Sequence, residues 1–172
     1  MTSKKTGAGP PGEHLVKELK WVHGRLRKDL RVLRELAAQI GSNASPALVR
    51  TKIRTLRTQS PLWQLRVNCL KYCRFVHGHH GGEDVNLFPA LRRSNPALVP
   101  TVKRLEADHR KISDLLDQVE ALARVLGDGS GTDTRERLVA AIDELSRRLL
   151  EHLDFEEKSI SPTLRTWTTW PG

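Results

Sequence analysis

The sequence predicts an all-α protein, an up-down-up-down four-helix bundle with an extra short helix and a C-terminal tail. Three observations support this prediction. Hydrophobic residues make up 38% of the chain and aromatic residues only 5%, and the apolar residues are mostly Leu, Val, Ala and Ile, which favours helices over strands. Apolar residues recur at steps of three and four over long segments, which places them on one helical face. An internal repeat also indicates that one helical hairpin is used twice.

The 172 residues suit a single domain with short terminal segments. Residues 1–12 lack an apolar run and are expected to form a disordered N-terminal segment, followed by the bundle over residues 13–166. Residues 167–172 form a C-terminal tail, which is expected to pack back on the bundle through its tryptophans. Because neither a secretion signal nor an apolar run of ~20 residues is found, we predict a cytoplasmic location without a membrane partner.

Four long helices and one short helix follow from the apolar spacing and from the turn-forming stretches between them. The first helix ends at GSNASP, the third begins after SNPALVP, and the fourth follows the loop GDGSGTDT, where Thr132 or Thr134 could cap it. The helices are expected at residues 13–40, 47–58, 62–93, 101–126 and 132–161.

Each long helix carries one histidine within its apolar stripe. In the first helix, His23 continues the spacing of Leu19 and Leu26. In the second and fourth helices, a glutamate follows the histidine one turn later. Since burying an unpaired carboxylate costs several kcal/mol, these side chains need a shared partner. The stripe residues concerned are His23, His79, Glu83, His109, His152 and Glu156.

The internal repeat pairs HHGGEDVNLFPALR (79–92) with HLDFEEKSISPTLR (152–165), without gaps. Both copies contain His-x3-Glu, then a second acidic residue, and later a proline, a leucine and an arginine at matching positions. His and Glu at i and i+4 lie on the same side of a helix, so both can reach one metal ion. Two hairpins would supply four imidazoles and two carboxylates, which suits two ions of iron or manganese, with zinc as an alternative.

On these residues, the sequence resembles the hemerythrin-like, or HHE cation-binding, family over roughly residues 16–164. The resemblance rests on His23, on HHGGED followed by LFPALR, on LEADH, and on HLDFEE followed by SPTLR. It implies two non-heme iron ions with an oxo or hydroxo bridge, and reactions with dioxygen, peroxide or nitric oxide. The ligands that it implies are His23, His79, Glu83, His109, His152 and Glu156.

Two departures from oxygen-carrying hemerythrins bear on function. Leu105 stands where the carriers have another histidine in the third helix, and His152 is paired with Glu156 rather than with a later aspartate. This pattern is similar to a histidine-poorer branch found in actinobacterial proteins, some of which resemble catalases. A missing imidazole leaves a coordination position open, which favours peroxide disproportionation over reversible oxygen binding.

Tyr72, the only tyrosine of the chain, is the candidate catalytic residue because it lies two turns before His79 on the same stripe. It could ligate a ferric ion or donate to a bound peroxide. The alternative is a core tyrosine whose hydroxyl is satisfied elsewhere. His77 and His80 lie off the stripe and are the weaker ligand candidates.

Three further pairs of residues leave alternatives open. Asp84 and Glu157 could orient imidazoles or could be exposed charges. Gly81 and Gly82 could leave space beside the metals for a small ligand or an access channel, or could mark a kink or tight packing. The two cysteines, four residues apart, share a helix face and are expected to be reduced core residues.

The net charge of +9 admits an anionic partner, but no nucleic-acid motif is found and the basic runs 25–34 and 50–57 fit solvated helix faces. The leading hypothesis is therefore a di-iron protein that disproportionates peroxide. The alternatives are a sensor or binding protein for oxygen, nitric oxide or iron, a di-iron oxidase acting on an organic substrate, and a basic interaction module with structural metals.

Overall fold

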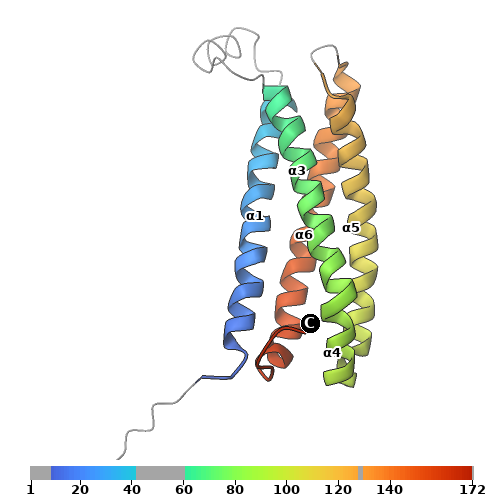
Figure 1. Ribbon diagram of the computed structural model, residues 1–172. Helices are drawn as coiled ribbons and strands as arrows, with labels where there is room; N and C mark the ends of the chain where they lie inside the picture. The colour runs from blue at the N-terminus through green and yellow to red at the C-terminus, as the bar shows by residue number, and fades with distance from the viewer. Residues whose placement is uncertain (1–8, 42–60, 128–129, 172) are drawn as a thin grey trace, which may run out of the picture.

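The computed structural model describes residues 9–41, 61–127 and 130–171. Within these ranges every element is helical and no strand occurs, so the all-α prediction is confirmed. Four long helices lie side by side along their lengths (Figure 1). They are α1 (Glu13–Gly41), α3 (Pro61–Gly82), α5 (Val99–Val125) and α6 (Thr132–Leu164). The short helix expected at 47–58 lies outside the described residues.

Each long helix packs on two others. Helix α1 contacts α3 and α6, and α5 contacts the same two helices from the other side. None of the helices in the described ranges is long and apolar enough to cross a membrane. The histidine-bearing faces of all four helices are thereby brought to one interior.

The apolar core consists of two clusters with a polar layer between them. The main cluster contains buried residues of 26–37, 65–76, 112–126 and 138–153. In α1, His23 lies between Leu19 of the second cluster and Leu26 of the main one, and His109 of α5 lies between the clusters in the same way. Fully burying one such leucine contributes about 1.5–3 kcal/mol, so apolar packing holds the layer from both ends. The second, tail-side cluster comprises Val16, Leu19, Leu87, Phe88, Leu91, Val102, Leu105, Ile160 and Leu164.

The second predicted helix is not continuous. After α3 the chain forms one π-helical turn, η1 (Glu83–Leu87), and then α4 (Phe88–Ser94). In this turn the Phe88 N–H donates to the carbonyl of Glu83, five residues earlier, instead of to the usual fourth. Such a wider turn is frequent at functional sites, and here its first residue is a candidate ligand.

Helix starts also differ from the prediction. Helix α5 begins at Val99, after the 3-10 turn η2 (Pro96–Leu98), with its proline in the first turn. Helix α6 begins at Thr132 with Gly131 at the N-cap position and no side-chain cap. The cap expected from Thr132 or Thr134 is therefore wrong, because these residues already lie in the helix.

The C-terminal tail packs on the bundle, as expected. Trp167 and Trp170 lie against the tail-side cluster, and the indole N–H of Trp170 donates to the Glu18 carboxylate at 2.6 Å. The residues just before α1 pack against the same end of the bundle. A Cβ atom on Gly12 would lie 1.8 Å from the Leu164 carbonyl oxygen, so only glycine fits this close approach.

The two cysteines, Cys69 and Cys73, are buried, unpaired thiols in the main cluster, which confirms the expected core role. The Cys73 thiol points at the Leu116 carbonyl oxygen, 3.5 Å away.

Candidate metal centre

Five imidazoles and two carboxylates meet in the layer between the two apolar clusters. They come from every long helix and from the π turn, and all are buried except His79, whose side chain is 12% exposed. The six residues predicted from the sequence are therefore brought together, and one further histidine joins them. The seven residues are His23, His79, His80, Glu83, His109, His152 and Glu156.

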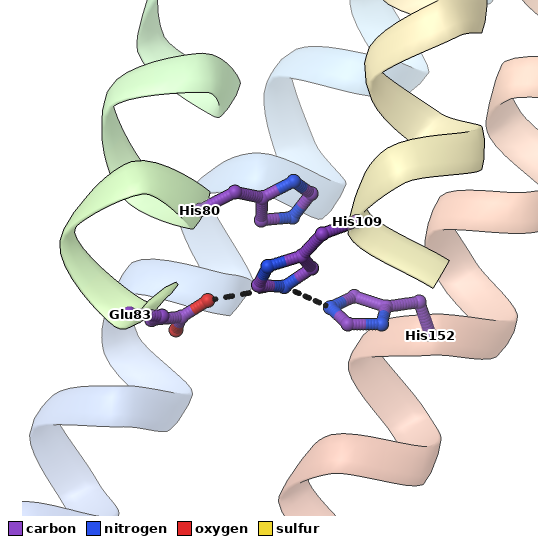
Figure 2. Close-up of side chains that lie close together, drawn as sticks. All are labelled: His80, Glu83, His109 and His152. Atoms are coloured by element: carbon purple, nitrogen blue, oxygen red, sulfur yellow. Dashed lines mark hydrogen bonds and ion pairs between the residues drawn. The ribbon is translucent and has the colours of Figure 1, made fainter. Parts of the chain in front are cut away.

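Their ligand atoms form two groups, and within each group these atoms lie within 4.8 Å of one another. One group contains His23, His79 and Glu83, and the other adds His80, His109 and His152 to the same glutamate (Figure 2). Glu83 faces both groups: its Oε1 is 3.2 Å from His79 Nε2, and its Oε2 is 3.5 Å from His109 Nε2. This carboxylate is therefore placed to contact two ions at once.

Glu156, which lies on α6, also faces both groups. Its Oε2 lies 3.5 Å from His23 Nε2 and 3.6 Å from His152 Nε2, and the residue is fully buried. Two ligands at ~2.1 Å from one ion and at right angles lie about 3 Å apart, so these separations are close to those of a shared metal. The two carboxylates thus connect the two sets of imidazoles.

The outer nitrogen of His23 is held by the opposite hairpin. His23 Nδ1 lies 3.0 Å from Glu157 Oε1, and Arg27 donates to the same carboxylate at 2.7 Å. Because an ionised carboxylate can only accept, Nδ1 carries the proton and Nε2 is left with its lone pair directed inward.

His109 repeats this arrangement with the hairpins exchanged. Its Nδ1 lies 2.8 Å from Asp84 Oδ1 in the π turn, so its Nε2 also faces the interior with a lone pair. Both Asp84 and Glu157 make the contact that the orienting interpretation requires, although the Asp84 side chain is also 43% exposed. The symmetry expected from the repeat therefore extends from the inner residues to these outer acids.

Burial determines the protonation states of the side chains in this layer. Loss of solvation lowers the pKa of His23 and of His109 to about 2 and that of His79 and of His152 to about 4. These imidazoles are therefore neutral near pH 7, as metal ligands must be. Burial, with help from neighbouring carboxylates, raises the pKa of Glu156 to about 8.

Several polar atoms of the layer lack a hydrogen-bond partner within the described part of the chain. His23 Nε2, His79 Nε2 and both side-chain oxygens of Glu83 and of Glu156 are buried without a hydrogen bond. Each such group costs about 1–3 kcal/mol if it stays unpaired. Cations between the two groups would pair all of them, and a mixed imidazole and carboxylate set suits iron, manganese or zinc. The residues present therefore fit a pair of metal ions.

His80, which the sequence made only a weaker ligand candidate, belongs to the site. It is 5% exposed, its ring stacks on that of His109 at 3.9 Å, and its Nε2 has no partner. A signal was present, because Cys73, Val76, His80 and Glu83 follow steps of three, four and three. The repeat hid it, since the matching position in the second copy is Leu153.

Other sequence candidates lie apart from the two groups. Tyr72 is buried and donates its hydroxyl to the Leu26 carbonyl at 3.2 Å, the contact that a core tyrosine would make, and its role as a catalytic residue stays a prediction. His77 pairs with Asp117 at 3.2 Å on the outer side of α3. Leu105 is fully buried in the tail-side cluster, so packing fills the position that is histidine in oxygen carriers.

The glycines differ from one another. Gly78 and Gly82 line a pocket of about 380 Å³ that also reaches His79 and Glu83, whereas Gly81 does not line it. A Cβ atom on any of the three would have nothing within 4 Å. Tight packing therefore does not explain the glycines at 81 and 82, and Gly82 fits the open-space interpretation.

Comparison of the chain with curated proteins and with solved structures gave no match. A family model described as the hemerythrin HHE cation binding domain matches residues 14–164, which includes all of the candidate ligands. This confirms the resemblance drawn from the sequence motifs. The chain therefore belongs to the hemerythrin HHE cation-binding domain family.

Proposed function

We propose that this protein holds a non-heme di-iron centre that reacts with oxygen species, and that its reaction is the disproportionation of hydrogen peroxide. Hemerythrin HHE domains bind metal ions, typically iron. The observation that carries the proposal is the pair of ligand groups that share Glu83, with Glu156 placed between them. A single ion in one group would leave buried nitrogens of the other without a partner, either His23 Nε2 and His79 Nε2 or His80 Nε2. The proposal includes the up-down-up-down helix order, which the contacts of α1 with α3 and of α5 with α6 support.

The ligand assignment follows the two groups. His23 and His79 would hold one ion, and His109, His152 and His80 the other, with Glu83 and Glu156 serving both. Asp84 and Glu157 keep Nδ1 of His109 and of His23 protonated, which fixes the inward direction of Nε2. The apolar clusters cover the two ends of the layer.

Two bound irons side by side supply an acceptor and donor of two electrons, the number exchanged when two peroxide molecules yield two waters and one dioxygen. The protein's part is to leave room for peroxide at the ions. The group of His23 and His79 has fewer imidazoles than the other and borders the pocket through His79. We therefore expect peroxide to bind on this side.

The test is iron content together with oxygen evolved from hydrogen peroxide. Iron-loaded protein should contain about two irons per chain, as other helical-bundle di-iron centres do, and should release oxygen. Glu83→Ala should lose iron and activity, whereas His77→Ala, on the outer side of the same helix, should keep both. Iron binding with a reversible spectral change but no oxygen release would favour the sensor or binding protein. Full activity in Glu83→Ala would contradict the assignment, and loading with manganese or zinc would show which ion the site retains.

A second candidate is a di-iron oxidase acting on an organic substrate. The pocket beside Gly82 favours it, because this pocket is larger than peroxide requires. It predicts that dioxygen is consumed only when an organic substrate and an external reductant are both present.

A further inference from the structure

We propose that the pocket between α1 and α3 is an access and binding site for a small neutral organic molecule with an apolar body and one hydroxyl or hydroperoxyl group. This inference rests on the proposed function for the metal ions beside the pocket. It assigns the ligand class and the side from which the ligand approaches.

The pocket has a volume of about 380 Å³ and three walls. Leu19 and Val22 form the wall on α1, Gly78 and Gly82 form the wall on α3, and Trp170 of the tail forms the third. Water occupies about 30 Å³ per molecule in the liquid, and small-molecule pockets begin near 300 Å³. The space therefore accommodates an organic body and is much larger than peroxide or dioxygen needs.

The pocket borders only one of the two ligand groups. His79 and Glu83 line it, and both belong to the group that includes His23. His79 is also the most exposed of the five imidazoles, and the other four are at most 5% exposed. A molecule in the pocket would therefore meet the ion on this side first, with its polar group next to Glu83.

The lining selects against charged ligands. Most of its surface is apolar, and the charged residues that line it are both acidic, Glu18 and Glu83. An anion would find no lysine or arginine in the lining, and a charge of either sign would lose its hydration against the apolar surface. Glu18 accepts from the Trp170 indole at 2.6 Å, which holds this carboxylate at the tail. A neutral hydroxyl can still donate to the Glu83 carboxylate.

The two glycines keep the pocket open. Gly78 and Gly82 are four residues apart and share the helix face that borders the pocket. Each costs the helix about 1 kcal/mol relative to alanine, yet no neighbouring atom lies within 4 Å of an added Cβ. Open space rather than close packing is what the missing side chains provide. Gly81, in the same helix but outside the lining, offers a matched control.

The experiment measures binding of benzyl alcohol to the iron-loaded protein by isothermal titration calorimetry at pH 7. Gly82→Leu should weaken binding by about tenfold or more, which corresponds to about 1.4 kcal/mol, and Gly81→Leu should leave it unchanged. Gly78→Leu, which fills the pocket from one turn earlier, should act like Gly82→Leu. Far-UV circular dichroism and iron content on each variant show whether the fold and the centre are retained.

Two related ligands test the charge preference. Benzoate and benzylammonium carry the same ring with a negative or a positive charge, and both should bind more weakly than benzyl alcohol. Tighter binding of either ion would overturn the assigned ligand class. Equal affinity of Gly82→Leu and Gly81→Leu for benzyl alcohol would overturn the pocket itself.

The two proposals fail in different ways. A protein that binds benzyl alcohol in the pocket but retains no iron would contradict the di-iron proposal and leave the binding site standing. A protein that holds iron and releases oxygen from peroxide, but binds benzyl alcohol equally in all glycine variants, would contradict only the pocket.

Discussion

In each pair of acidic residues that follows a ligand histidine, the two carboxylates point in different directions and have different roles. Glu83 faces the interior, while Asp84 next to it accepts from His109 of the other hairpin. Glu156 and Glu157 repeat this division toward the interior and toward His23. Adjacent positions in a helix point about 100° apart, so one carboxylate can be a ligand while its neighbour orients an imidazole. The two hairpins are thereby tied to each other through their histidines.

The orienting role of Glu157 predicts a loss of metal affinity without loss of a ligand. We expect Glu157→Ala to weaken metal binding by about 10–100-fold, because His23 would no longer be held with Nε2 inward. Asp154→Ala is the matched control, since Asp154 pairs with the same Arg27 but contacts no ligand of the group around His23. Competition with a metal chelator measures both affinities. Equal losses in the two variants would assign the effect to the arginine instead.

His80 can be tested against its counterpart in the repeat. His80→Leu places leucine where the second copy has Leu153, and we expect the group of His109 and His152 to lose its ion first in a chelator titration. His77→Leu, on the outer side of α3, should leave the titration unchanged. An unchanged titration for His80→Leu would limit this residue to stacking on the His109 ring.

At the scale of elements, the apolar spacing located all four long helices but not the π turn. Leu87, Phe88 and Leu91 are buried after Glu83, and the aligned residues of α6 are buried too, although α6 continues as one helix through this region. The same pattern of buried positions thus accompanies both geometries, with Ser161 in place of Phe88, so periodicity could not distinguish them. The sequence difference just before the turn is Gly81–Gly82 in place of Asp-Phe, which loosens the helix.

Alanine substitutions at Gly81 and at Gly12 should change the free energy of unfolding in opposite directions. Gly81→Ala should raise the free energy of unfolding by about 0.5–1 kcal/mol, because alanine favours a helix and its Cβ meets nothing within 4 Å. Gly12→Ala should lower it, since the Cβ would lie 1.8 Å from the Leu164 carbonyl oxygen. Urea denaturation measures both changes. A loss of stability in Gly81→Ala would mean that the π turn requires this glycine.

For the whole molecule, the sequence predicted the helical class, the packing of the tail and six side chains that the structure brings together in the candidate centre. The helical class and the six side chains depend on spacing along single helices, which the chain records directly. The access pocket and the stacking of His80 on His109 depend on how α1, α3, α5 and the tail meet, which no single helix specifies. Besides the π turn and the helix ends, the departures therefore concern contacts between elements.

The two buried thiols can report on how firmly the metals hold the four helices together. Burial raises the pKa of Cys69 and of Cys73 to about 12, from a model-peptide value of 9.0, so both stay protonated in the folded bundle at pH 8. Thiolates are the reactive form, and a disulfide reagent should therefore label them only when the bundle opens. Above about pH 9 the unfolded thiols ionise while the folded ones do not, so stability should fall as the pH rises further.

Metal binding should then slow this labelling. The ions would bind the folded layer and not the unfolded chain, so loading should stabilise the bundle by an amount that grows with metal concentration. We expect labelling at pH 8 to be slowest in iron-loaded protein, faster after chelation, and fastest in urea. Glu83→Ala should remove the difference between the first two conditions, because it removes the carboxylate shared by both groups. Identical labelling rates with and without metal in the unmodified protein would show that the apolar clusters alone keep the bundle closed.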